Sequence, residues 1–269
     1  MSGFSTDWLA LREPYDLRAR DSEVLAAVVT FLAALPSVQI VDLACGTGAT
    51  VRALTGRLPA TQNWRLADND LGLLGRAKAM PLAETVSVTA FPLDLNRDLE
   101  AALDGPIDLI TTSAFLDLVS KEWLDRLVTE TAARSIPFYA ALTYDGRIEI
   151  SPRDPADAAI IAAVNEHQTT DKGFGPALGP QAADYAVAGF ERLGYAVTRR
   201  QSDWIIGPRD RDIQLEIFSG WAGAAREVGA LSLLETASWL TRRCELVTAA
   251  VSSLRVGHVD FFAAPTGTR

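Results

Sequence analysis

The chain has 269 residues, of which 48% are hydrophobic and 22% charged, and its formal net charge is −9. This is the composition of an ordinary globular protein, and its negative charge argues against phosphate backbones and anionic lipid surfaces as partners. Two cysteines and two histidines exclude a disulfide framework and offer no zinc-site spacing, and the N-terminus lacks the apolar stretch of a secretory signal, so we expect a cytoplasmic protein without a metal.

The first half of the chain alternates between helices and strands. Asp21 or Ser22 can begin a helix that Pro36 ends. Short apolar runs predict strands at 38–43, 63–68, 86–93, 107–113 and 136–144, and helical spacing is found at 49–58, 71–80 and 121–134. Alternation of this kind predicts a parallel sheet with helices on both faces, whose ligands lie at the carboxyl ends of the strands.

Beyond residue 144 the pattern changes. A helix begins after Asp154 and is followed by a glycine- and proline-rich loop at 169–181. Then come a helix that Gly194 ends and a strand at 195–207. Two helices, 211–228 and 231–250, separate that strand from a last one at 256–265. An insertion of this length in an α/β chain is usually a lid or an interface.

The segment after the first strand, residues 41–50, reads VDLACGTGAT and is the strongest motif. The small residues Ala44, Gly46 and Gly48 allow a sharp turn against which a flat ligand can lie. A dinucleotide site would need a third glycine where Val51 stands, so the turn suits a ligand without a pyrophosphate. Asp42 either orients the turn or meets a cationic amine of the ligand, often through water. A purely structural turn is the alternative.

Two further acids end the next two strands. Asp68 can accept both hydroxyls of a ribose, or it is only a solvated loop acid. Asp70 is expected to begin the following helix. Asp94 can accept the amino group of an adenine, with the backbone N–H of Leu95 near a ring nitrogen. The alternative for Asp94 is a second helix cap.

Together these segments resemble the motifs of the class I S-adenosylmethionine-dependent methyltransferases. VDLACGTG resembles the first motif, with Ala44 in place of the first glycine, and residues 64–80, 91–96 and 107–119 resemble the next three. The resemblance implies a doubly wound, mostly parallel α/β sheet of seven strands with the last one antiparallel, and S-adenosylmethionine as cofactor. The expected donor-binding residues are Asp42, Ala44, Gly46, Gly48, Asp68, Asn69, Asp94, Leu95, Ser113 and Arg20.

The methyl acceptor is expected to be a small polar metabolite that presents an O, N or C centre. We expect a single domain over 1–269, with an N-terminal cap segment at 1–20 and insertions at 145–180 and 209–252 that cover the acceptor. His167 and Tyr144 are candidate catalytic residues, and His258 is interpreted as structural. The candidate acceptor-binding residues are Tyr15, Arg18, Asp117, Tyr144, His167, Lys172 and Trp204.

Two other functions remain open at this stage. A donor-binding or scaffold subunit without catalysis would have no acceptor cavity under its cap. A nucleotide-dependent oxidoreductase is disfavoured by Val51 and by the extra acid Asp94. The sequence does not decide between a monomer and a homodimer.

Overall fold

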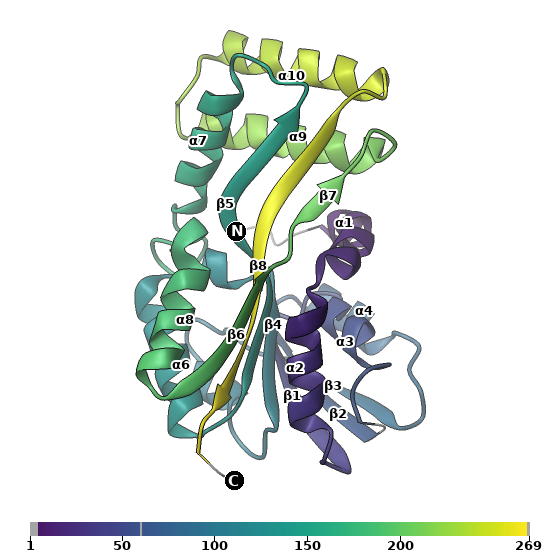
Figure 1. The fold of residues 1–269 in the computed structure, drawn as a ribbon, viewed down its shortest axis with the longest axis vertical. Helices are drawn as coiled ribbons and strands as arrows, with labels where there is room; N and C mark the ends of the chain where they lie inside the picture. The colour runs from purple at the N-terminus through teal and green to yellow at the C-terminus, as the bar shows by residue number, and fades with distance from the viewer. Residues whose placement is uncertain (1–4, 60, 268–269) are drawn as a thin grey trace.

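The computed structural model describes residues 5–59 and 61–267. Its strands form one sheet in the order β3-β2-β1-β4-β5-β8-β6, and β7 pairs with β8 (Figure 1). The strands are β1 (Ser37–Leu43), β2 (Thr61–Asp68), β3 (Val86–Pro92), β4 (Leu109–Ser113), β5 (Phe138–Ser151), β6 (Tyr195–Gln201), β7 (Trp204–Ile206) and β8 (Ser253–Pro265). β1 to β5 are parallel and β8 is antiparallel to β5. The predicted doubly wound, mostly parallel sheet with an antiparallel last strand is confirmed.

Helices cover both faces of this sheet, and each face has its own apolar core. They are α1 (Thr6–Ala19), α2 (Ser22–Leu32), α3 (Ala49–Leu54), α4 (Leu71–Lys78), α5 (Leu99–Ala102), α6 (Lys121–Ala133), α7 (Asp157–Gln168), α8 (Ala182–Arg192), α9 (Arg211–Glu227) and α10 (Leu233–Thr248), with short 3-10 turns η1 (Leu116–Leu118) and η2 (Gly179–Gln181). Asp21 and Asp70 begin α2 and α4 as predicted, because each carboxylate accepts two backbone N–H groups of the first turn. None of the described helices is long and apolar enough to cross a membrane.

A second, smaller layer of structure extends from one end of the sheet. β5 and β8 continue past the other strands and, with β7, carry α7, α9 and α10 (Figure 1). We call these helices, β7 and the outer halves of β5 and β8 the outer lobe. It has its own core, in which Ile160, Phe218 and Trp239 are fully buried. The predicted end of the fifth strand at residue 144 was therefore too early, because pairing with β8 carries β5 on to Ser151.

The strand predicted at 195–207 is divided into β6 and β7. Between them, the carboxylate of Asp203 accepts the backbone N–H of His258 at 3.2 Å, and Ser202 donates its own N–H to the carbonyl of His258 at 2.9 Å. In a regular sheet the N–H of His258 would donate to a backbone carbonyl of the neighbouring strand. Here it donates to the Asp203 side chain instead, so the pairing with β8 is interrupted between β6 and β7. The sheet accordingly has eight named strands where seven were predicted.

Candidate functional site

A turn with left-handed backbone follows β1. Ala44, Gly46 and Gly48 have φ angles of 52°, 53° and 80°. Asp68, at the end of β2, holds this turn in place: its Oδ2 accepts the N–H of Gly46 at 2.9 Å, and its Oδ1 accepts the N–H of Asp70 at 3.0 Å. Asp68 therefore braces the turn, a role the sequence did not predict, and each oxygen keeps a lone pair for a ligand.

Ala44 adopts a conformation that a side chain disfavours. Replacing Ala44 by glycine is therefore expected to raise the free energy of unfolding by about 0.5–1 kcal/mol, since the relief of strain exceeds the added flexibility of the unfolded chain. Urea denaturation measures this. Ala53, inside α3, is the matched control, because its replacement by glycine should lower stability by about 0.5–1 kcal/mol. An equal loss of unfolding free energy in Ala44→Gly and Ala53→Gly would contradict the backbone strain assigned to Ala44.

Asp42 lies beneath the turn and is completely buried. Its Oδ1 accepts the hydroxyl of Thr111 at 2.7 Å, while Oδ2 has no hydrogen-bond partner among the described residues. Burial raises the pKa of Asp42 to about 7, against the hydrogen bond from Thr111 and the positive charge of Arg20. An unsatisfied buried oxygen of this kind is suited to a ligand or water contact.

Arg20 joins two of the predicted donor-binding segments. Its guanidinium is buried and donates to the Tyr139 hydroxyl at 3.1 Å and to Ser113 Oγ at 3.2 Å, at the end of β4. Its charge also acts on Asp42 and Asp260. Arg20, at the end of α1, thus bonds to Ser113 at the end of β4, and its charge acts on Asp42 near the end of the neighbouring β1.

The third acid, Asp94, follows β3 and is half-buried. Its Oδ1 accepts the N–H of Asn96 at 2.9 Å, so it stabilises a local turn, while Asp98 occupies the N-cap position of α5. The adjacent Leu93 donates its N–H to the carbonyl of Asp68 at 3.1 Å, which places the ends of β2 and β3 side by side. Asp94 is therefore not the N-cap of α5, which was the alternative interpretation from the sequence.

Leu95 and Asn69 are the remaining residues predicted to bind the donor. Leu95 is buried, and its carbonyl accepts the indole N–H of Trp123 at 2.8 Å. Asn69 is exposed and faces a large cavity beside the turn.

Helix α1 lies over the glycine turn. A Cβ built on Gly46 would stand 3.6 Å from Leu9 Cδ1 of this helix. Arg52 of α3 is paired with Glu13 of α1, Nε to Oε1 at 2.5 Å, and donates to the carbonyl of Thr47 at 2.7 Å. The N-terminal segment is therefore tied directly to the turn.

The same helix is also tied to the outer lobe. Tyr15 donates its hydroxyl to Asp210 at 2.9 Å, and the indole of Trp204 donates to Asp16 at 3.0 Å. Arg18 stacks on the ring of Tyr15, 4.4 Å from its centroid. These contacts hold Tyr15 and Arg18 away from the cavity, which among the described residues of α1 is lined by Trp8 and Arg12. Tyr15 and Arg18, the residues predicted to contact the acceptor, therefore do not line the cavity; Trp8 and Arg12, about two helical turns earlier in α1, do.

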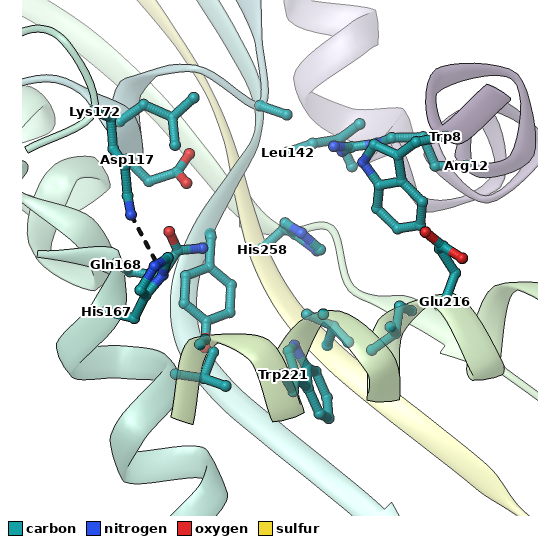
Figure 2. Close-up of a pocket in the computed structure, with 18 of the residues that line it drawn as sticks. Trp8, Arg12, Asp117, Leu142, His167, Gln168, Lys172, Glu216, Trp221 and His258 are labelled. Carbon is teal, nitrogen blue, oxygen red and sulfur yellow. Dashed lines mark hydrogen bonds between the residues drawn. The ribbon is translucent and has the colours of Figure 1, made fainter. Parts of the chain in front are cut away.

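A cavity of about 1060 Å³ lies between the strand ends, α1 and the outer lobe (Figure 2). It reaches the ends of β2 and β4 at residues 69–72 and at Ala114. Its remaining lining combines aromatic and aliphatic walls with a few polar groups: Trp8, Arg12, Asp117, Leu118, Leu142, Tyr144, Val164, His167, Gln168, Lys172, Phe174, Trp204, Glu216, Ile217, Gly220, Trp221, Ala224, Val256 and His258. A mostly apolar pocket with few convergent polar groups is typical of a small-molecule site.

Two lining residues have strained backbone conformations. Ala114, after β4, and Leu142, in a bulge of β5, have φ angles of 51° and 56°. Ala44 is a third non-glycine residue in the left-handed region; Ala44 and Ala114 follow the ends of neighbouring strands, and Leu142 lies in β5 just after its pairing with β4 ends. Strain of this kind gathers at functional sites, where it orients groups toward a ligand.

Asp117 is the most deeply buried acid of the cavity. It is 5% exposed, and its Oδ1 has no hydrogen-bond partner in the part of the chain described. Burial raises its pKa to about 6, opposed by hydrogen bonds from its own backbone and that of Tyr144 and by the charges of Arg12 and Lys172. The carboxyl is thus poised to exchange a proton near neutrality.

His167 and Lys172 form a chain of polar contacts at the cavity wall. Lys172 Nζ lies 3.3 Å from His167 Nδ1, and His167 Nε2 lies 2.9 Å from Glu227 of α9. Burial lowers the pKa of Lys172. The structure brings both predicted residues to the cavity, where His167 has a partner on each ring nitrogen and positions Lys172.

Tyr144 and Trp204 also reach the cavity, but their polar atoms are engaged elsewhere. The Tyr144 hydroxyl donates to Asn165 at 2.7 Å, and burial keeps the pKa of this phenol well above its usual range. His258, which the sequence suggested was structural, lines the cavity beside the Trp204 ring at 5.1 Å between centroids. Burial lowers the pKa of His258 to about 3, so its imidazole is neutral at physiological pH.

Trp8, Arg12 and Glu216 are lining residues that sequence reasoning missed. Trp8 and Arg12 are four residues apart, on one face of α1. Arg12 pairs with Asp16 and lies 4.8 Å from the ring centroid of Trp204. The spacing of Trp8, Arg12 and Asp16 was the available signal.

No protein-family model matches the sequence, and no curated protein matches it significantly. Solved structures do match. A cyclopropane-fatty-acyl-phospholipid synthase-like protein from Lactobacillus casei has a TM-score of 0.51 at 14% identity, covering 93% of this chain and 98% of that one. The cyclopropane synthase MmaA2 from Mycobacterium tuberculosis scores 0.50 at 12% identity, covering 97% and 94%. The YcgJ protein from Bacillus subtilis scores 0.50 at 12%, covering 92% and 100%.

This chain has the fold of those proteins. The Rossmann-like architecture implied by the resemblance to class I methyltransferases is thereby confirmed across nearly the whole chain.

Proposed function

We infer that this protein is an S-adenosylmethionine-dependent methyltransferase that acts on a small molecule bound in the cavity. The observation that supports this most directly is the junction of two features. Asp68 braces the glycine turn, and the residues directly after it, 69–72, together with Ala114 line a cavity large enough for an acceptor. Ligands of open α/β sheets bind at this edge.

The residues at the rim fit the proposed donor. Asp68 and Asn69 would hold the ribose hydroxyls, and Asp94 with the N–H of Leu95 would hold the adenine. The turn of Ala44, Gly46 and Gly48 would carry the amino-acid end. The unsatisfied Oδ2 of buried Asp42 would accept from the amine, often through water, with Arg20 and Ser113 beside it.

The bound donor supplies a methyl group on a positively charged sulfur, which needs no further activation. The protein then has to align the acceptor and, where the acceptor is protonated, to remove its proton. Both tasks fall to the cavity lining, with the insertions of the outer lobe as its cap. An acceptor with an O, N or C centre fits this scheme.

The cavity also favours this function over a scaffold role. A non-catalytic donor-binding subunit would have the segments 165–175 and 211–250 packed tightly over the strand ends. Instead, His167, Lys172, Ile217 and Trp221 from those segments line open space.

Replacing Asp68 by alanine is expected to weaken binding of S-adenosylhomocysteine about 10- to 100-fold, because the ribose loses its acceptor and the Gly46 N–H loses its brace. Isothermal titration calorimetry measures the affinity. Asp108→Ala is the matched control: its carboxylate also accepts a backbone N–H, from Gln39 at 2.9 Å, but at the opposite end of the strands. An unchanged affinity in Asp68→Ala would show that the ribose lies elsewhere. No binding by the wild-type protein would refute the function.

A further inference from the structure

Most of the labelled polar side chains of the cavity lie on two sides in Figure 2. Asp117, His167, Gln168 and Lys172 lie together on one side, and Arg12 and Glu216 lie on the other. Between them lie rings and aliphatic side chains, with the neutral imidazole of His258 among them. A ligand that matches this pattern has an apolar body and a polar group at its end.

The end that holds Asp117 adjoins the donor-binding rim. Asp117 lies four residues beyond the last residue of β4, and Ala114, between them, lines the cavity at that rim. Its unpartnered, buried Oδ1 is a strong acceptor that no side chain in residues 5–59 or 61–267 satisfies. Leaving such an atom unpaired is costly, so the site calls for a ligand atom that carries a hydrogen.

The charges around Asp117 decide which kind of atom this is. Lys172, from the loop after α7, lies at the same end of the cavity; the charge of Arg12 acts on Asp117 from α1, and from β5 the backbone of Tyr144 reaches it as a hydrogen-bond donor. A cation beside the reacting atom stabilises a group that becomes negative as it loses its proton. It would repel an amine that is, or becomes, positively charged. An oxygen acceptor is therefore favoured over nitrogen.

The side chains that form the walls of the cavity indicate which kind of molecule carries the acceptor oxygen. Trp8, Tyr144, Phe174, Trp204 and Trp221 all line the cavity, and flat rings pack well against such surfaces. A phenol also matches the chemistry, because its pKa near 10 lies within reach of a carboxylate base, whereas that of an aliphatic alcohol is far higher.

We propose that the acceptor is an aromatic hydroxyl compound and that Asp117 is the catalytic residue that takes its proton. In the transfer, the phenolic O–H bond breaks and its proton passes to Asp117 Oδ1. A lone pair of the oxygen forms the bond to the methyl carbon as the carbon–sulfur bond breaks, with that electron pair remaining on sulfur. This inference rests on the proposed methyltransferase function and names its substrate class.

The test is a binding experiment with matched probes. The protein is saturated with S-adenosylhomocysteine and titrated calorimetrically with two pairs, phenol with anisole and 2-naphthol with 2-methoxynaphthalene. In at least one pair the hydroxyl compound should bind about 10-fold or more tightly than its methyl ether. Equal binding within both pairs would overturn the substrate class.

Two variants locate the effect. Asp117→Asn should lower the affinity for the hydroxyl probe about 10-fold and leave the affinity for S-adenosylhomocysteine unchanged. Asp212→Asn, the same change at an exposed position of α9 outside the cavity lining, should alter neither. Retention of the hydroxyl preference in Asp117→Asn would exclude Asp117 as the proton acceptor. Failure of wild-type protein to bind S-adenosylhomocysteine would instead refute the proposed function, so the two failures are distinguishable.

Discussion

Replacing Gly46 by valine is expected to abolish donor binding, with the affinity for S-adenosylhomocysteine falling about 100-fold or more. Gly46 has a φ of 53°, which a β-branched residue strongly disfavours, and its Cα faces Leu9 of α1 across a narrow space. A valine side chain would fill the space that a ligand needs against the turn. Isothermal titration calorimetry on the folded variant measures the loss.

Gly56→Val provides the matched control for this change. Gly56 is exposed after α3, and a Cβ built on it meets nothing within 4 Å. Its replacement should leave donor affinity as in the wild type. If Gly46→Val remained folded by circular dichroism and bound the donor normally, the turn would not be part of the donor site.

The second large effect concerns the pH dependence of stability. Burial raises the pKa of Asp42 from its ordinary 3.8 to about 7. Between these values the folded protein holds a proton that the unfolded chain has released. The stability contributed by protonated Asp42 is therefore fully present below pH 3.8 and is lost as the pH rises through about 7.

Asp42→Asn removes this loss, because asparagine cannot ionise and can still accept from Thr111. The difference in free energy of unfolding between variant and wild type should grow in the variant's favour from pH 4 to pH 8. We expect a change on the order of a few kcal/mol, at about 1.4 kcal/mol for each unit of pKa shift. Urea denaturation across this range measures it.

Asp212→Asn, at an exposed position of α9, controls for the removal of one negative charge. If the free energy of unfolding changed with pH in the same way for Asp42→Asn and wild type, Asp42 would have the same pKa in the folded protein as in the unfolded chain.

The parts of the fold that sequence reasoning predicted are those with local causes. Asp21 and Asp70 begin helices through their own carboxylates, and the turn at Gly46 and Gly48 needs the backbone freedom of glycine. The positions of strands β1 to β4 along the chain followed from short apolar runs that alternate with helical segments. These signals lie within a few residues of the structure they specify.

What could not be predicted depends on distant partners. β5 extends to Ser151 only because β8 pairs with it, and β6 ends where Asp203 captures the N–H of His258. Arg12 rather than Arg18 faces the cavity because the indole of Trp204, far along the chain, bonds to Asp16 beside it. Each of these partners is far along the chain from the residue it contacts, so no local sequence pattern predicts the contact.

Because α1 is joined at Glu13 to the side chain of Arg52 and at Tyr15 to Asp210, it bridges the glycine turn and the outer lobe. On the proposed function, a shift of this helix as one ligand enters would also move Trp8 and Arg12 in the cavity. Occupancy of the donor and acceptor sites would then be thermodynamically linked, and by reciprocity each ligand would alter the affinity for the other by the same factor.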